Sequence, residues 1–340
     1  MGRGECVLFV TVPEFLVDQT AAINSAALDA TGSTASALIE ATKPGITRLV
    51  TTTAMVGLAM SVAVRPWTLG QLLIAAAGVL VGTALSASGA NAINQVMEHR
   101  RDALMNRTMR RPIPRGRGTT SQVLTAGIIL SVAGVALLWA VCGIVPAMVS
   151  LACVLSYVLI YTPLKPITTL ATFVGTIPGA LPPLIGYSAA ASVSAANVES
   201  VSPWLSLLEP LGISLVVLMC VWQVPHFLAI AWMYKDDYIR GGYRVLPAIE
   251  QTGSWTAATI ALWSVALLPA TLLPAAVAPE LLGLPYLGIA TVSGLAFIAL
   301  AAKLLASRDR AAARRVFFAS IIHLPVVLIA MVCEAILRAI

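Results

Sequence analysis

Apolar segments long enough to cross a lipid bilayer recur along this chain from residue 46 to its C-terminal end. Hydrophobic residues make up 59% of the sequence and charged residues only 11%, whereas soluble domains carry about 25% charged residues. The pattern predicts an all-α polytopic membrane protein. Nine transmembrane helices are predicted, at residues 46–64, 69–97, 121–143, 145–162, 168–190, 206–232, 254–278, 284–306 and 316–338.

The residues before the first of these segments do not form a predicted membrane span. Residues 1–39 are predicted to form an extension, disordered or interfacial, and residues 40–340 a transmembrane domain. The stretch "CVLFVTVPEFLV" is too short to span a bilayer, and the extension lacks the cleavage site of a signal peptide. The five cysteines show neither a CxxC pair nor zinc-ligand spacing, so we expect no disulfide framework.

The basic residues are distributed unevenly about these nine segments. With the N-terminus in the cytoplasm, only Arg65 and Arg338 of the 21 lysines and arginines fall on the outer side. The outer loops at 191–205 and 279–283 carry glutamate but no lysine or arginine. The positive-inside rule therefore predicts an N-in, C-out bundle, and it explains the net charge of +6 without a nucleic-acid partner.

An acidic stripe follows the second apolar segment. Asn94, Glu98 and Asp102 are spaced four residues apart, which places them on one helix face with a drift of about 40° per step. Carboxylates contribute little to topology, and a polar stripe at the membrane is costly unless it lines a cavity or binds a ligand. Local salt bridges with neighbours such as Arg101 are the alternative explanation.

A second acidic cluster, Asp236 and Asp237, is predicted to reach the same membrane face. Carboxylate oxygens beside a phosphate suit Mg²⁺, and the seven arginines between residues 94 and 117 suit a polyanion. This combination predicts a site for a lipid-tailed diphosphate. Lys165, in "YTPLKPITT", lies on the same side and is either a third phosphate contact or an ordinary topology marker.

The stripe and the sequence after it carry a family resemblance. Asn94-x3-Glu98-x3-Asp102 followed by "MNRTMRRPIP" resembles the first acidic motif of the UbiA-type intramembrane prenyltransferases, in the form found in the haem O synthase (protohaem IX farnesyltransferase) subgroup. The strings "KPGITRLV", "YTPLK", "GALPPLIGY" and "WQVPHFLAIAWMYKDDYIRGGYRVLP" support that subgroup in order, so the resemblance covers residues 40–335.

The resemblance implies a nine-helix bundle with a central cavity open to lipid, and it implies roles for individual residues. Asn94, Glu98, Asp102 and Asp237 would be the catalytic, Mg²⁺-binding residues. Arg107, Arg111, Lys165, Tyr161, His226 and Asp236 would bind substrate. For His226, contact with a porphyrin and a hydrogen bond to a neighbouring helix are both open. His323 is expected to be an interhelical partner.

The implied reaction is Mg²⁺-dependent transfer of a farnesyl group from farnesyl diphosphate to a vinyl group of haem b. Water is added in the same reaction, giving haem O for terminal oxidases. The implied setting is the cell's inner (plasma) membrane, with the active site on the cytoplasmic side. Membrane lipid surrounds the bundle, and haem A synthase or a terminal oxidase is a candidate partner.

Two other functions fit parts of the sequence. A prenyltransferase acting on a quinone precursor or a chlorophyll-type ring would share the acidic motif, so only the "WQVPHF" region bears on the acceptor. A transporter or lipid-binding membrane protein would share the hydropathy, although such proteins often contain internal repeats and none is evident here.

Overall fold

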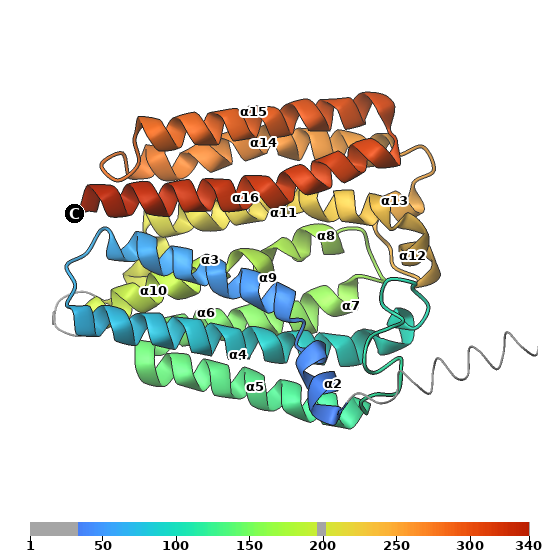
Figure 1. Ribbon diagram of the computed structural model, residues 1–340, viewed down its shortest axis with the longest axis horizontal. Coiled ribbons are helices and arrows are strands. Elements are labelled where there is room, and N and C mark those ends of the chain that lie inside the picture. The colour runs from blue at the N-terminus through green and yellow to red at the C-terminus, as the bar shows by residue number, and fades with distance from the viewer. Residues whose placement is uncertain (1–32, 196–201, 340) are drawn as a thin grey trace, which may run out of the picture.

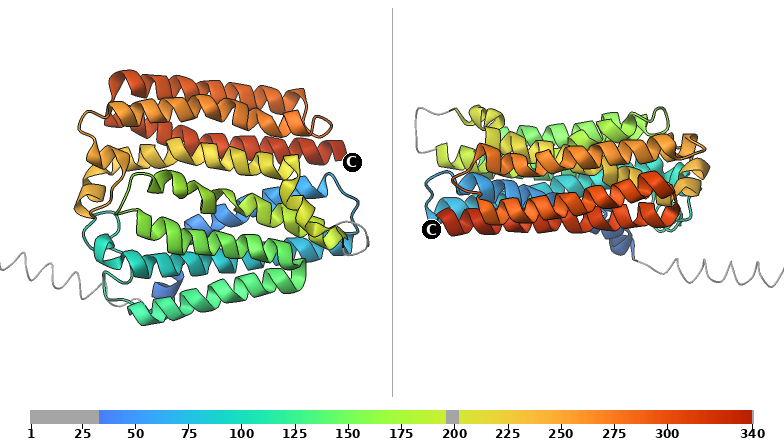
Figure 2. Two further views of the ribbon diagram at one scale, coloured as in Figure 1. Left: turned by 180° about the vertical axis from the view of Figure 1, so that it is seen from behind. Right: turned by 90° about the horizontal axis from the view of Figure 1, so that it is seen from above.

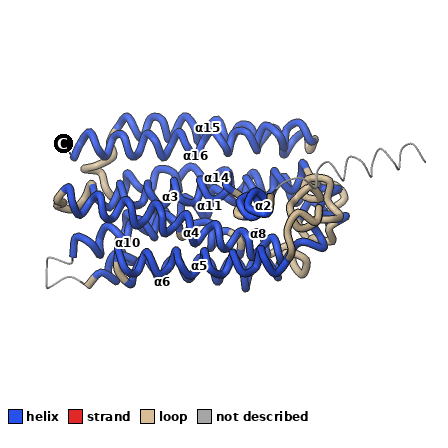
Figure 3. The backbone as a smooth tube through the Cα atoms, turned by 60° about the horizontal axis from the view of Figure 1, so that its bottom comes forward, coloured by secondary structure: helices blue, strands red, loops and turns tan. Residues whose placement is uncertain are grey.

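The computed structural model describes residues 33–195 and 202–339, and every regular element within these ranges is a helix (Figures 1 and 3). Most of the predicted N-terminal extension lies outside the described residues. The last residues of the extension form most of α2 (Thr34–Ala41), a short helix whose first turn is capped by the Ser33 hydroxyl.

Eight helices within the described ranges are long and apolar enough to cross a membrane. They are α3 (Pro44–Val62), α4 (Leu69–Asp102), α5 (Thr120–Cys142), a continuous helix formed by α6 (Ile144–Leu155), η1 (Ser156–Tyr161) and α7 (Thr162–Leu164), α11 (Pro210–Met233), α14 (Ser254–Val277), α15 (Leu284–Ser307) and α16 (Arg310–Ala339). The prediction of an all-α protein with many membrane spans is confirmed.

The predicted fifth span, residues 168–190, is broken instead of continuous. It comprises α8 (Ala171–Val174), α9 (Thr176–Ala180) and α10 (Pro182–Ala195). Proline lacks the N–H of a helical hydrogen bond and its ring clashes with the preceding turn, which accounts for the break before α10. The structure therefore does not confirm nine uninterrupted spans in the described ranges, because this segment divides into three pieces.

The helices form two groups that meet along α11 (Figures 1 and 2). One group contains α11, α14, α15 and α16, and the other contains α3, α4, α5, α6 and α10. The short helices α8 and α9 of the broken segment pack against α11, between the two groups. This arrangement leaves an interior between the groups that is bordered by short, interrupted helices.

One end of the bundle carries the elements that bring charge to the interior. Helix α2, the loop after α4, α12 (Lys235–Arg240) and α13 (Leu246–Ile249) all lie at that end (Figure 1). At the other end lie the 3-10 helix η2 (Pro203–Leu208) and the C-terminus of α16. The two acidic clusters of the sequence therefore reach the same end of the bundle.

The opposite end contains Arg65 and Arg338, the two basic residues that were predicted to lie on the outer side of the membrane. Arg65 forms an ion pair with Glu209, whose second oxygen accepts a 2.6 Å hydrogen bond from Tyr187. Arg338 pairs with Glu334 at 2.9 Å. Each cation thus has a carboxylate partner beside it, as expected for charges at the edge of an apolar bundle.

Glycines allow α3 and α10 to approach closely. A Cβ added to Gly186 would lie 1.8 Å from the backbone oxygen of Ala54, and one on Gly57 would lie 1.8 Å from the oxygen of Pro183. Backbone atoms cannot move aside as a flexible side chain can. These contacts therefore set the distance between the two helices, as small residues do in membrane bundles.

We expect Gly186→Ala to lower the thermal stability of the detergent-purified protein by several degrees, because α3 and α10 must separate. The matched control is Gly288→Ala on α15, where an added Cβ meets nothing within 4 Å and alanine is the better helix former by about 1 kcal/mol. A thermal unfolding curve of each variant measures the difference. Equal midpoints for the two variants would contradict the close approach.

Candidate active site

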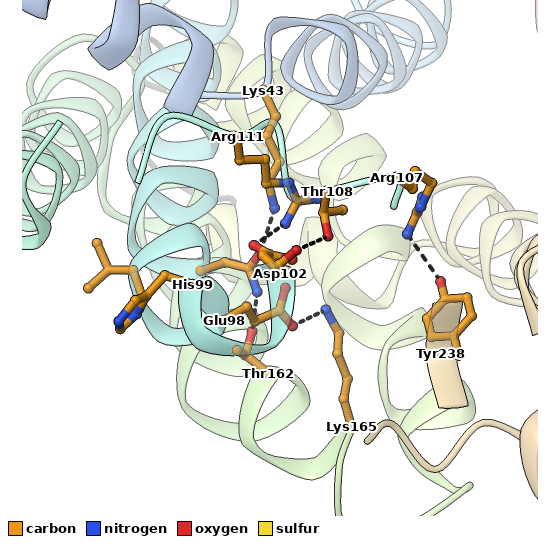
Figure 4. A network of polar contacts seen from close by, with 12 residues as sticks. Lys43, Glu98, His99, Asp102, Arg107, Thr108, Arg111, Thr162, Lys165 and Tyr238 are labelled. Atoms are coloured by element: carbon orange, nitrogen blue, oxygen red, sulfur yellow. Dashed lines mark hydrogen bonds and ion pairs between the residues drawn. The ribbon is translucent and has the colours of Figure 1, made fainter. Parts of the chain in front are cut away.

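The acidic stripe occupies the last turns of α4 and faces the interior of the bundle (Figure 4). Asn94 and Asp102 are fully buried and Glu98 is 7% exposed. Because buried charge is stable only when it is paired or coordinated, the surroundings of these three side chains define the site.

Three cations from separate elements converge on the stripe (Figure 4). The Lys165 ammonium lies 2.8 Å from Glu98 Oε1, and Arg111 Nη1 lies 2.5 Å from Asp102 Oδ2. Lys43 Nζ donates a 2.5 Å hydrogen bond to Asn94 Oδ1. The alternative of local salt bridges with Arg101 and neighbouring arginines is met in part: Arg111 pairs with Asp102, whereas Arg101 donates to the backbone oxygens of Gly241 and Gly242.

Lys43 was not predicted as a site residue, because a single lysine before an apolar segment is typical of a topology marker. It is the N-cap of α3 and has φ of 50°, an uncommon backbone conformation for a non-glycine residue. Burial, aided by the positive charge of Arg111, lowers the Lys43 pKa to about 7. The one sequence signal was its place in the "KPG" string that carries the family resemblance.

Asp102 retains one buried oxygen, Oδ1, that has no hydrogen-bond partner within the described chain. Such an orphaned carboxylate oxygen is costly unless a ligand supplies a partner. Glu98 presents a second carboxylate to the same space. No group of three or more His, Cys, Asp or Glu side chains in the described ranges forms a ready cage for a metal. Two carboxylates with open positions fit Mg²⁺, which takes its remaining ligands from water and substrate phosphates.

Asp237 makes a different set of contacts. Its carboxylate accepts the backbone N–H groups of Asn106 and Arg107, at 3.0 and 3.2 Å, and pairs with Arg240. Burial opposes ionisation, but these hydrogen bonds outweigh it and lower the Asp237 pKa. Asp237 thus holds the arginine-rich loop against α12, and it does not line the cavity. Asp236 is exposed and also lies outside the cavity lining.

The loop held by Asp237 directs Arg107 over two aromatic rings. The guanidinium lies 5.2 Å from the ring centre of Tyr234 and 5.8 Å from that of Tyr238, and it donates to the Tyr238 hydroxyl at 3.4 Å. These contacts fix a cation at the mouth of the site, and no carboxylate in the described ranges pairs with it. Its charge remains available to an anion.

Lys165 lies beside a π-helical turn, η1, of the kind often found at functional sites. Its ammonium is 4.3 Å from the ring centre of Tyr161 and 6.0 Å from that of Tyr157. Burial alone would lower the Lys165 pKa, but Glu98 and the two tyrosines raise it well above its usual value. Lys165 is therefore a permanent positive charge at the site.

A cavity of about 410 Å³ extends from these charges into the bundle. At its charged end it is lined by Lys43, Glu98, Asp102, Arg107, Arg111, Tyr161 and Lys165. Its lining also includes Thr83 on α4, 19 residues before Asp102, which corresponds to about 28 Å along a helix. Apolar side chains and small residues line the part between. The cavity is thus long, charged at one end and apolar along most of its length.

The structure brings together most of the predicted residues. Asn94 is the exception on α4: its oxygen is taken by Lys43, its amide donates to Thr162 at 2.9 Å, and it does not line the cavity. Asn91 lines the cavity and was not predicted as a site residue. Its carboxamide, one helical turn before Asn94, could have indicated it from the sequence. The assignments of metal and substrate roles remain predictions.

The histidines differ in position. His226 lines the cavity, with Nδ1 2.7 Å from the Ser320 hydroxyl. His323 is buried between helices, with its ring nitrogens 2.8 Å from Ser293 and 3.3 Å from Thr271. The expectation that His323 is an interhelical partner therefore agrees with its contacts.

Membrane helices around a long apolar cavity, with carboxylates and cations at one end, define a polytopic membrane protein with a charged internal site. The UbiA prenyltransferase family profile matches residues 49–322. The chain is 37% identical to a protoheme IX farnesyltransferase of Opitutus terrae over 300 residues, which are 87% of this chain and 93% of that relative. The chain therefore belongs to the UbiA prenyltransferase family.

Other similar proteins agree with this membership. A protoheme IX farnesyltransferase of Solibacter usitatus is 35% identical over 73% of this chain and 80% of its own length. Among solved structures, one described as digeranylgeranylglyceryl phosphate synthase matches with a TM-score of 0.69 at 16% identity, covering 89% of this chain and 99% of its own. A UbiA homolog from Archaeoglobus fulgidus bound to DMAPP and Mg²⁺ matches with a TM-score of 0.54 at 11% identity, covering 89% of this chain and 98% of its own. At these identities the structures support the fold.

We expect Lys43→Met to weaken binding of inorganic diphosphate with Mg²⁺ by about tenfold or more, since a charge-assisted hydrogen bond contributes about 1.5–3 kcal/mol. The matched control is Arg48→Met, which removes an exposed cation one turn further along α3 that does not line the cavity. Isothermal titration calorimetry measures both. Equal losses in the two variants would show that only the overall charge matters.

Proposed function

We propose that this protein transfers a farnesyl group from farnesyl diphosphate to a vinyl group of haem b, giving haem O. Membership of the UbiA family supplies the reaction class, and relatives named protoheme IX farnesyltransferase favour haem over a quinone precursor as acceptor. The observation that carries the proposal is the cavity with carboxylates and cations at one end and an apolar remainder.

The charged end binds the diphosphate in this proposal. Lys43, Arg111 and Lys165 surround two carboxylates, and Arg107 adds a fourth cation at the mouth. Positive charge therefore exceeds negative charge before any ligand enters. A diphosphate carries the charge that balances this excess, and guanidinium groups match its oxygens in geometry.

Mg²⁺ is the proposed cofactor, because an orphaned Asp102 oxygen beside Glu98 fits a hard cation. When bound there together with the diphosphate, it would neutralise charge and improve the leaving group. Asp237 contributes by holding the loop that carries Arg107. Its direct coordination of the metal remains a prediction that would require release of this loop.

The reaction needs no protein nucleophile. The bond between farnesyl C1 and the diphosphate oxygen breaks, and Lys43, Arg111 and Lys165 stabilise the charge on the departing diphosphate. The vinyl carbon of the porphyrin attacks the allylic cation, water adds to the resulting cation, and one proton is released. An apolar cavity keeps water from the allylic cation before attack.

The proposed orientation in the membrane rests on the distribution of lysines and arginines along the chain. We propose an N-in orientation in the plasma membrane, with the charged end on the cytoplasmic side, because basic residues gather there. A haem A synthase or terminal oxidase as a docking partner remains a prediction from the family resemblance.

The direct test is the product mass after incubation of purified protein with farnesyl diphosphate, Mg²⁺ and an acceptor. We expect haem b to gain one farnesyl and one hydroxyl group, 4-hydroxybenzoate to remain unchanged, and chelation of Mg²⁺ to stop the reaction. Prenylation of the benzoate alone would replace the haem proposal with the quinone-precursor alternative. Absence of diphosphate release in the presence of haem b would remove the enzyme proposal.

Asp102→Asn should lower turnover by at least about 100-fold, comparable to loss of one group that stabilises transition-state charge. The amide can still accept from Arg111, so the protein should fold, with a lowered thermal midpoint because the buried ion pair is lost. The control is Asp309→Asn, in which an exposed carboxylate at the start of α16 is replaced by another good capping residue. Full activity of Asp102→Asn would exclude the acidic stripe from catalysis.

A further inference from the structure

The cavity contains, beyond its charged end, an imidazole that the diphosphate chemistry does not use. His226 is on α11, seven residues before the helix ends at Met233, and so lies about 10 Å from the charged end of the bundle. It lines the cavity together with Trp222 and Phe227. What this imidazole can bind depends on which ring nitrogen carries its proton.

The hydrogen bonds of Ser320 determine that tautomer. The Ser320 hydroxyl has a single proton, and it donates to the backbone oxygen of Phe317 at 2.6 Å, an atom that can only accept. The same hydroxyl is 2.7 Å from His226 Nδ1. Ser320 must therefore accept there, so Nδ1 carries the proton and the neutral ring has its lone pair on Nε2.

His226 Nε2 has no hydrogen-bond partner in the described chain, and it is not among the fully enclosed atoms. His323 shows the contrasting arrangement, because both of its nitrogens have hydroxyl partners at neighbouring helices. A histidine that only joined α11 to α16 would be satisfied in the same way. His226 instead presents a free lone pair to the cavity.

The ring is also held in one orientation. It stacks on Trp222 with ring centres 4.7 Å apart and on Phe317 at 5.4 Å, with interplanar angles of 19° and 26°. The Trp222 indole N–H donates to the backbone oxygen of Ser320 at 2.9 Å. Both aromatic neighbours and the Nδ1 partner are thus tied to one turn of α16.

A neutral imidazole with a free Nε2, an Nδ1–H bound to an oxygen and a fixed ring plane has the features of a metal-ligating histidine. On the basis of the proposed function, we propose that His226 Nε2 binds the iron of the haem substrate and so positions the porphyrin in the cavity. Ser320 is a positioning residue that acts through His226. The apolar walls at Trp222 and Phe227 suit the porphyrin faces.

This contact explains how the acceptor could be recognised without charge. The iron is the one feature of the ring that a neutral nitrogen can bind in an apolar site. A ligand two helical turns from the diphosphate end places the porphyrin in the same cavity as the prenyl donor. Axial binding through a single nitrogen is reversible, which is compatible with release of a product that retains its iron.

The test compares two porphyrins that differ only in the metal. Purified protein in nanodiscs is titrated with ferric haem b and with metal-free protoporphyrin IX, and absorption spectra give the dissociation constants. We expect His226→Gln to weaken haem binding by at least about tenfold and to remove the iron–imidazole stretch from the resonance Raman spectrum of the ferrous complex. Binding of metal-free protoporphyrin should be unchanged.

Two further variants separate ligation from packing. Ser320→Ala keeps the imidazole but removes its Nδ1 partner, so the iron–imidazole stretch should persist at a shifted frequency. His323→Gln alters a histidine outside the cavity lining and should leave the haem spectrum unchanged. Equal losses for both porphyrins in His226→Gln would show that the residue is only a wall of the cavity.

The outcomes also distinguish this inference from the proposed function. If wild-type protein forms farnesylated haem while the haem spectrum is independent of His226, the ligation is wrong and the proposed function stands. If wild-type protein binds neither porphyrin, both are wrong. If haem binds through His226 but no farnesylated product forms, the ligation stands and the proposed reaction is wrong.

Discussion

The structure depends on how charge is balanced where α4 ends inside the bundle. Glu98 and Asp102 are buried there, and each would be strongly destabilising without Lys165 and Arg111 beside it, since breaking a buried ion pair costs about 3–5 kcal/mol. Lys43 adds a further cation, whose pKa is lowered to about 7 by burial. The protein alone thus leaves a cationic excess and an unpartnered carboxylate oxygen, which Mg²⁺ and a diphosphate would complete together.

Much of the fold could be predicted because a helix that crosses a lipid bilayer needs about 20 consecutive apolar residues. Apolar length gave the positions of eight spans. The segment 168–190 was predicted as one span, and the structure divides it into α8, α9 and α10, because prolines interrupt its backbone hydrogen bonds. Helix α4 continues past its apolar run to Asp102, and α16 begins before its apolar run at Arg310.

The site was predictable where its residues are close in sequence. The spacing of Glu98 and Asp102 placed both on one face of α4, as the structure has them. Lys43 could not be found by spacing, because it contacts the stripe from another helix and its backbone conformation is not visible in composition. For Asp237, acidity suggested a metal ligand, whereas its contacts show a residue that holds the arginine-rich loop. Sequence indicates which groups are unusual, and tertiary contacts determine what each one faces.

The central claim is that Glu98 and Asp102 hold a divalent cation against a diphosphate bound by the surrounding cations. The most direct measurement is an anomalous difference map from crystals grown with Mn²⁺ in place of Mg²⁺ and with a non-reactive farnesyl thiodiphosphate. The account predicts an anomalous peak within coordination distance of Asp102 Oδ1, with phosphate density between it and Lys43. Density for the diphosphate at this end without a metal peak beside Asp102, or a metal peak elsewhere, would contradict it.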